Sequence, residues 1–274
     1  MYKINKSKTW RSLLIALSLA FVSGQFVQAH IMTENSQFPD IKESDARFDI
    51  VALVAIGIIP ETPTFEPQRN LSHADLAAWG ALAANLSAGG DEKPSVAELA
   101  KLVQEKGLVS SLEGDATYAE INTVLFKGAH VAEHPEAIPT RAEAARYIAT
   151  GLASAAGTAV LEGKGLHFGP TGVVSGVEQK TNPDGGESSF ITIGDTSIPM
   201  FTHGRVGNGP SDLAKWKDLT VSRSLIRKKG GVSLWVYLES ATAAGSDDEK
   251  GHDHSAHKHD EAAEHNHEEH KHDK

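Results

Sequence analysis

The segment Leu71-Ser-His-Ala-Asp75 and two later stretches of the same form, Thr117-Tyr-Ala-Glu120 and Thr140-Arg-Ala-Glu143, decide the fold of the first half of the chain. Each stretch places a Ser or Thr three residues before an acid. At this spacing the hydroxyl accepts a hydrogen bond from the backbone N–H of the acidic residue, and the carboxylate reaches back to the backbone N–H of the hydroxyl residue. Such capping boxes open helices, and three of them predict repeats of one helix–loop–helix unit.

Further helical segments surround these capping boxes. Residues 38–152 are rich in Ala and Leu, and both Arg47–Gly57 and Ser95–Gly107 end at a glycine, a usual C-terminal stop of a helix. A proline-rich loop, Pro60–Pro67, leads from the first of these segments toward Leu71. We therefore expect this region to form a bundle of short helices.

Part of this helical region is similar to an S-layer homology repeat. The consensus of that family runs F-x-D, then G-I-I/V, then F-x-P, then I-T-R-A-E. The matching segments of this chain are Phe38-Pro-Asp-Ile41, Gly57-Ile-Ile59, Phe65-Glu-Pro67 and Leu71-Ser-His-Ala-Asp75. The later segment Thr140-Arg-Ala-Glu143 matches the last element letter for letter. The resemblance covers roughly residues 38–152, under half of the chain, and is good in the first repeat and degenerate in the second and third.

This resemblance implies a compact bundle of three repeats that holds a secreted protein to cell-wall polymer. In the family, the Arg of T-R-A-E tends to lie in the grooves that bind wall glycan. Arg141 alone fills this slot, since His73 and Tyr118 stand at the matching positions of the other two boxes. Arg141 is therefore the glycan contact that the resemblance predicts. The alternative is that the repeats serve as a scaffold or as a protein-docking module.

The composition changes to Gly, Val, Ile, Thr and Ser after about residue 157, which is typical of strands. The predicted strands are Val160–Gly165, Gly172–Lys180, Ser189–Gly194, Ser197–His203, Asp218–Arg227 and Gly231–Glu239. Asn182-Pro-Asp-Gly-Gly186 marks a turn between two of them, and the last strand has apolar residues at 232, 234, 236 and 238. We expect a small antiparallel β-barrel or sandwich of OB-like or immunoglobulin-like form.

The two ends of the chain differ from these middle parts. Residues 1–29 combine a basic head, a short apolar run and a small residue before position 30, the pattern of a secretory signal. The apolar run is about ten residues and a bilayer needs roughly twenty, so we expect no membrane span in the mature chain. The prediction is an α+β multidomain protein with a signal peptide (1–29), a helical domain (30–156), a β domain (157–240) and a disordered His-rich tail (241–274).

Charge and composition exclude several classes of function. The net charge is −10, and removal of the signal with its four positive charges lowers it to −14, which argues against nucleic acid as a partner. The chain has no cysteine, so thiolate zinc sites, thiol catalysis and iron–sulfur clusters are excluded. Asp195, His203 and Ser211 supply the residue types of a hydrolytic triad, but no strand–elbow–helix signal surrounds Ser211. We therefore do not predict an enzyme.

The tail carries the residues that point to a function. Eight of the fourteen histidines form four His-x-His pairs, namely His252/His254, His257/His259, His265/His267 and His270/His272. The two members of a pair lie on the same side of an extended chain, because side chains alternate between sides. Imidazole suits zinc, nickel, cobalt and copper, and neighbouring Asp and Glu residues add oxygen ligands. These eight histidines are the predicted metal ligands.

A basic cluster stands in the otherwise acidic second half of the chain. Its members are Arg223, Arg227, Lys228 and Lys229. Such a cluster fits either a solvated strand face or a docking place for the acidic tail or a wall polymer.

Together these patterns predict an exported protein of the cell envelope, located in the periplasm or at the cell surface. Its tail binds, buffers or captures divalent transition metals, and its helical repeats hold it to the envelope through cell-wall glycan or an envelope protein. The alternative is a structural protein that attaches to the cell wall or S-layer, in which metal binding is secondary.

Overall fold

Capping boxes open four helices in the computed structural model of the chain, which describes residues 31–33, 37–86, 95–107, 109–181, 187–229 and 231–242. The predicted reciprocal hydrogen bonds are present at the starts of α4 (His73–Ala83), α6 (Tyr118–Phe126) and α7 (Arg141–Gly151). A fourth box, which was not predicted, opens α5 (Val96–Glu105). The three predicted capping boxes are therefore confirmed.

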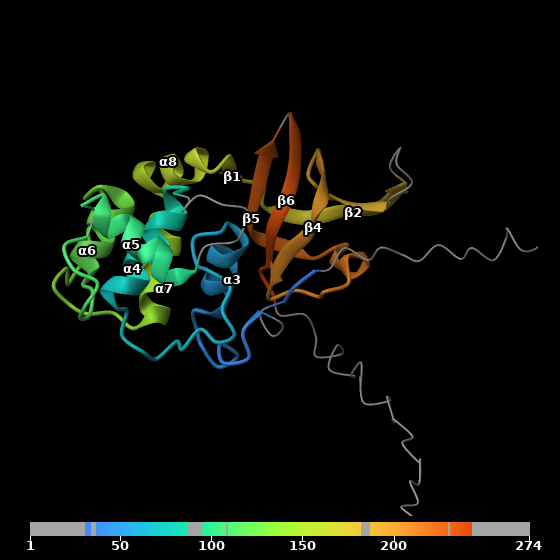
Figure 1. Cartoon of the computed structure of the whole chain (residues 1–274). Helices are drawn as coiled ribbons and strands as arrows, with labels where there is room; N and C mark the ends of the chain where they lie inside the picture. Colours follow the sequence, from blue (N-terminus) through green and yellow to red (C-terminus); the bar gives the residue numbers. More distant parts are fainter. Residues whose placement is uncertain are drawn as a thin grey trace, which may run out of the picture. The chain divides into compact units, whose positions relative to one another are not determined.

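Helix α3 (Arg47–Ala55) lies between the other helices and the strands. Its buried residues form one unbroken run: Ile50, Val51, Ala52, Leu53 and Val54. A helix that is apolar all round is stable only when it is covered on all sides. It contacts α7 on one side and both β4 (Thr196–Gly207) and β6 (Val232–Ser240) on another (Figure 1). Gly57, at φ 68°, follows its end, as predicted.

The helices share one apolar core with the strands that they cover. Within it the ring centroids of Phe38 and Phe65 lie 5.6 Å apart, and those of Phe65 and Trp79 lie 6.1 Å apart. The same core includes strand residues from β5 (Thr220–Lys229) and β6, namely Leu225, Val236 and Tyr237. A second apolar cluster fills the space between the strands, and its largest members are Trp216 and Trp235. In the part of the chain described, no helix is long and apolar enough to cross a membrane.

The strands form one mixed sheet. β2 (Gly172–Thr181), β3 (Glu187–Ile193) and β4 pair in antiparallel order, and so do β5 and β6. β4 and β6 pair in parallel, so the prediction of a purely antiparallel arrangement was wrong. The chain between them passes through the 3₁₀ turn η1 (Leu213–Trp216) and the whole of β5, which lets β6 run in the direction of β4.

β2, β3, β4 and β6 each pair with two strands, and β5 pairs with three. β2 pairs with β3 and β5, and β6 pairs with β4 and β5. The short strand β1 (Leu166–Phe168) is added on β5. The order along the sheet is therefore β1-β5-β2-β3-β4-β6, with a further pairing between β5 and β6.

The predicted strand Val160–Gly165 was wrong, because most of these residues belong to helix α8 (Ala155–Gly163). Ser154 caps this helix by accepting a hydrogen bond from the backbone N–H of Gly157, and Leu161 is fully buried against the helical core. Its small residues let α8 pack closely on the end of α7, an effect of tertiary packing that composition does not reveal. The expected domain boundary between residues 156 and 157 falls within α8.

Strand β6 also differs from the predicted alternation. Val232 is 54% exposed, whereas the four consecutive residues Trp235, Val236, Tyr237 and Leu238 are all buried. Val236 and Tyr237 pack in the core shared with the helices, and Trp235 and Leu238 pack between the strands. Because both faces of this strand are covered, apolar residues are needed on both.

Charged side chains tie α3 to the strands. Arg223 of β5 donates to Asp49 of α3 at 2.7 Å and, through Nε, to Glu239 of β6 at 2.9 Å. The hydroxyl of Tyr237 lies 3.0 Å from the carbonyl oxygen of Phe48 and 2.8 Å from the Glu239 carboxylate. The contact between α3 and the strands is therefore both apolar and ionic.

Two glycines of α8 test the close packing of this helix. A Cβ at Gly157 would overlap the carbonyl oxygen of Gly151 and the backbone of Leu152, whereas a Cβ at Gly163 would meet nothing within 4 Å. We expect Gly157→Ala to lower the free energy of unfolding by about 1–3 kcal/mol through overpacking. Gly163→Ala is the matched control. It should raise the free energy of unfolding by up to about 1 kcal/mol, because Ala has a higher helix propensity than Gly. Urea unfolding of both variants measures the difference, and equal effects would contradict it.

Candidate functional site

The segments that precede α4, α6 and α7 lie side by side. The backbone N–H of Leu71 donates to the carbonyl of Pro139 at 3.0 Å, and the N–H of Ala116 donates to the carbonyl of Leu71 at 2.8 Å. The N–H of Tyr118 donates to the carbonyl of Ala137 at 3.1 Å. These bonds connect each capping box to the other two, so three helix N-termini gather at one place.

In two cases the residue that follows the Ser or Thr of one capping box contacts the acidic residue of another box. Arg141, from the third box, forms an ion pair with Asp75 of the first. His73, from the first box, lies with Nε2 2.9 Å from the carboxylate of Glu120 of the second. The three boxes are thus joined by side chains as well as by backbone hydrogen bonds.

Arg141 is buried, with 5% of its surface exposed. Its Nε donates to the carbonyl oxygen of Phe65 at 2.7 Å, and its guanidinium lies over the rings of Phe65 and Trp79 at 4.8 and 5.4 Å. Burial alone would raise the pKa of Asp75, but Arg141 and the hydrogen bond from Ser72 hold it below its usual value. In this arrangement Arg141 braces the start of α7 against the start of α4, and its predicted glycan contact stays a prediction.

His73 has a hydrogen-bond acceptor at each ring nitrogen. Nδ1 lies 2.6 Å from the carbonyl oxygen of Glu113, and Nε2 faces the Glu120 carboxylate. A carbonyl and a carboxylate only accept, so both contacts are hydrogen bonds when the ring carries two protons. Burial acts to lower the pKa of His73, but the hydrogen bonds to Glu113 and Glu120 outweigh it and raise the pKa above 6.5.

The eight predicted metal ligands, His252, His254, His257, His259, His265, His267, His270 and His272, lie outside the described residues. Within the described part of the chain, no group of three or more His, Asp or Glu residues could hold a metal ion. His130 and His134 lie in a loop, where the His130 ring stands 4.5 Å from the ring of Tyr147.

The three residue types of a hydrolytic triad are spread over the strands and their connections. Asp195 lies in the turn between β3 and β4, His203 lies within β4, and Ser211 lies between β4 and η1. Among the described residues no hydrogen bond joins any two of these three. The ring of His203 instead stands 5.9 Å from that of Phe201.

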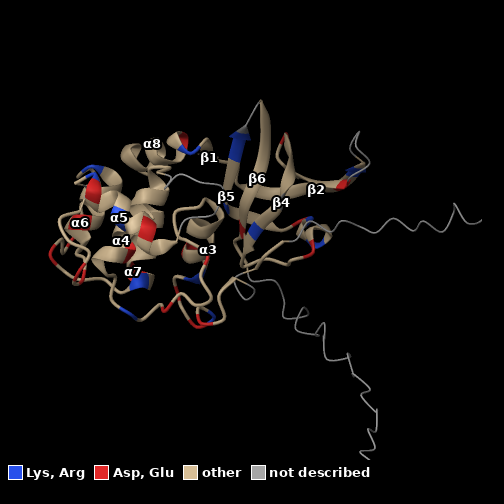
Figure 2. Ribbon diagram, in the orientation of Figure 1, with Lys and Arg blue, Asp and Glu red and all other residues tan. Residues whose placement is uncertain are grey.

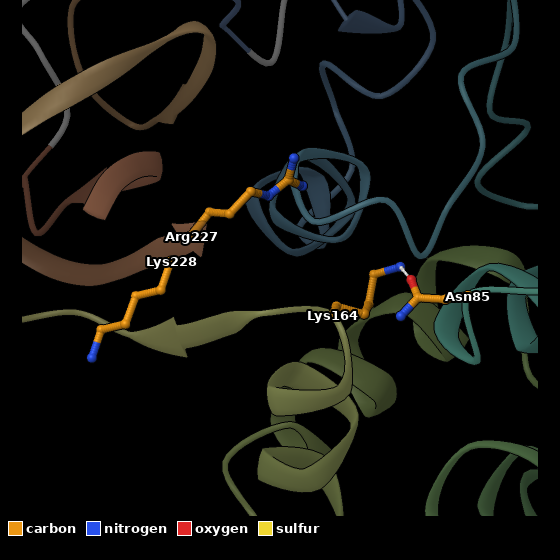
Figure 3. A pocket seen from close by; sticks show the side chains of 4 residues that line it. All are labelled: Asn85, Lys164, Arg227 and Lys228. Carbon is orange, nitrogen blue, oxygen red and sulfur yellow. Dashed lines mark hydrogen bonds between the residues drawn. The ribbon is translucent and has the colours of Figure 1, made fainter. Parts of the chain in front are cut away.

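The predicted basic cluster divides into two parts. Arg223 is engaged by carboxylates at the contact with α3. Figure 2 shows the end of β5 in blue, and here Arg227 and Lys228 line a pocket of about 290 Å³ together with Asn85 and Lys164 (Figure 3). The last two residues were not predicted, because they come from the ends of α4 and α8, far from β5 in the sequence.

Lys164 occupies a neutral hydrogen-bonding environment in this pocket. Its ammonium donates to the carbonyl oxygen of Leu82 at 2.7 Å and to Oδ1 of Asn85 at 2.9 Å. Burial, together with the nearby charge of Arg227, lowers the pKa of Lys164 to about 8. Nε of Arg227 is buried and has no hydrogen-bond partner among the described atoms.

Comparison of the chain with models of protein families gives no match, and comparison with curated proteins gives none. The resemblance to S-layer homology repeats therefore rests on the residues quoted above.

The bracing role of Arg141 can be tested against a second arginine that pairs with the same carboxylate. The Arg141→Met variant leaves Asp75 buried without its closest cation, and we expect a loss of about 3 kcal/mol or more in the free energy of unfolding. Arg69 also contacts Asp75, at 3.0 Å, but its side chain is 45% exposed. The Arg69→Met variant should therefore lose less than about 1 kcal/mol in urea unfolding. Similar losses in the two variants would refute the bracing role.

His73 should make stability depend on pH. Because its folded pKa is raised, its stabilising contribution is complete below pH 6.5 and disappears as the pH rises through the folded pKa. The difference in unfolding free energy between the wild type and His73→Gln should therefore shrink from pH 6 to pH 8.5. His134→Gln, a change in an exposed loop, is the control. A His73→Gln difference that stays constant over this range would contradict the assignment.

Proposed function

We propose that the chain is an exported, non-enzymatic protein of the cell envelope that binds, buffers or captures divalent transition metals through its tail. The observation that carries this proposal is the spacing of eight histidines as four His-x-His pairs between positions 252 and 272. Each pair offers two imidazoles on the same side of an extended chain, and zinc, nickel, cobalt and copper all accept such ligands. The metal is cargo in this proposal, and its identity is left to experiment.

The distribution of ligands over the chain supports an assignment to the tail. The described residues hold no group of three or more His, Asp or Glu that could ligate a metal. Catalytic sites need rigid ligands and an open coordination position, whereas the spacing of the His-x-His pairs points only to chelation. Buffering, capture and transfer need only chelating pairs with exchangeable metal. We infer that the protein releases metal below about pH 6.5, where imidazoles become protonated.

We further infer the architecture of the two folded parts. The gathering of three equivalent capping boxes supports a bundle of three S-layer-homology-like repeats. The strand order β2-β3-β4-β6-β5, closed by the pairing of β5 with β2, supports the OB-like alternative over the immunoglobulin-like one. An immunoglobulin-like sandwich would split the strands into two separate sheets. The barrel belongs to a class that commonly binds oligosaccharides.

A second candidate function is attachment to the cell wall, with metal binding secondary. The observation that favours it is the convergence of three helix N-termini, which carries the positive ends of three helix dipoles to one place. Sedimentation with purified cell wall separates the two functions, because metal buffering does not require it. If a chain without its tail still sediments with the cell wall, attachment is the main function and metal binding is secondary.

The metal proposal makes a quantitative prediction. Replacing the eight tail histidines with Gln keeps the length and the formal charge at pH 7, and it should remove most of the Zn²⁺, Ni²⁺ and Cu²⁺ sites seen by isothermal titration of the chain that starts at His30. The double variant His130→Gln/His134→Gln is the matched control and should retain all sites. Truncation after Ser246 should reproduce the loss. If the eightfold variant and the unaltered chain titrate alike, the tail does not store metal.

A further inference from the structure

The pocket at the end of β5 is lined by residues that donate hydrogen bonds. Arg227, Lys228 and Lys164 carry positive charge, and the oxygen of the fourth lining residue, Asn85, already accepts a hydrogen bond from Lys164. Among the described residues, no carboxylate lines the pocket. A cation is therefore repelled here, and a ligand that accepts hydrogen bonds and carries negative charge is favoured.

Two of these cations come from opposite sides of the pocket. Lys164 follows helix α8, and Arg227 lies near the end of β5. Figure 3 shows the side chains of Arg227 and Lys228 pointing away from each other, with the ammonium of Lys164 beside Asn85. The charge that acts on Lys164 comes from Arg227, so two positive groups face a shared space without a compensating negative one.

The hydrogen-bonding state of both cations leaves room for a ligand. Lys164 uses two of its three N–H groups on Leu82 and Asn85, which leaves one donor free. The buried Nε of Arg227 has no partner among the described atoms. The fork geometry of a guanidinium matches two oxygens of one oxyanion, which supplies the acceptor that Nε lacks.

The volume of the pocket limits the ligand. At about 290 Å³ it lies just below the roughly 300–1,000 Å³ range of small-molecule sites. It can hold a tetrahedral oxyanion together with a substituent of modest size, but not a folded polymer chain.

We propose that this pocket binds a small sulfate or phosphate group between Lys164 and Arg227, with Lys228 adding positive charge at the rim. The group is either a free ion or the head of a small ester. Binding of the anion neutralises the charges of Lys164 and Arg227. The net charge of the chain is −10 and repels anions, so the attraction comes from these local cations.

The test uses the full chain and inorganic sulfate, which keeps its double negative charge throughout the pH range used. Sodium sulfate is titrated at pH 7 against sodium chloride of equal ionic strength, while the Nε–H resonances of the arginines are followed by nuclear magnetic resonance. The Arg227 resonance is assigned by its disappearance from the spectrum of the Arg227→Lys variant. Its chemical shift should change with sulfate concentration along a saturating curve. A hexose 6-phosphate is the second probe: tighter binding than sulfate identifies an ester head, and equal or weaker binding identifies a free ion.

Variants locate the site and provide the control. Arg227→Gln should raise the dissociation constant for sulfate at least tenfold, and Lys180→Gln should leave it unchanged, because the exposed Lys180 on β2 does not line the pocket. Sulfate binding should weaken between pH 7 and pH 9 as Lys164 loses its proton, and Lys164→Met should abolish this dependence. An Arg227 resonance that does not move in the unaltered chain overturns the proposal, whether or not the variants fold. Equal weakening by Arg227→Gln and Lys180→Gln also overturns it.

Discussion

The ion pair between Arg141 and Asp75 couples the start of α7 to the start of α4. Asp75 serves its own capping box, where it accepts a hydrogen bond from Ser72. At the same time it holds the buried guanidinium of Arg141 from the start of α7. A carboxylate that caps a helix is normally a local device. Here the same group is also a long-range contact, so α4 cannot fray at its start without exposing a buried charge. The aromatic rings of Phe65 and Trp79 enclose that charge and make the contact apolar as well as ionic.

A guanidinium between carboxylates is used again where the helices meet the strands. Arg223 joins Asp49 of α3 to Glu239 of β6, and the hydroxyl of Tyr237 lies within reach of both elements. From Ile50 to its end, helix α3 carries only apolar side chains, so its position depends on being covered by α7 on one side and by strands on the other. The helical and strand parts therefore share a core, although their compositions differ sharply.

Local signals were predictable from sequence, and contacts between distant segments were not. The hydroxyl-to-acid spacing of the capping boxes and the glycine after α3 act within one turn of helix, so a short segment contains the whole signal. Five of the predicted strands are found within a few residues of their expected limits. Helix α8 was missed because its Ala, Gly and Val residues suit a strand as well as a helix, and packing against α7 decided between them. The parallel pairing of β4 with β6 depends on how the whole sheet closes, which no single segment encodes.

The same division holds for the candidate sites. The tail histidines could be proposed as ligands from sequence because their spacing alone suggests chelation. The burial of Arg141 and the shared pocket of Lys164 and Arg227 are products of tertiary structure. Asn85 and Lys164 carry no local signal for a pocket, since each becomes part of it only when the ends of α4 and α8 meet β5. Arg223 and Arg227, four residues apart on one strand, illustrate the point: one is neutralised by carboxylates and the other is not.

The position of β6 has a mechanical consequence. It is the last described strand of the chain, and it is hydrogen-bonded along both edges, in parallel to β4 and in antiparallel to β5. A load applied at its C-terminal end acts along the strand, so two hydrogen-bond ladders and a strand core buried on both faces must be sheared together instead of being peeled apart one bond at a time. A pull on the C-terminal end of β6 is therefore resisted by both ladders at once.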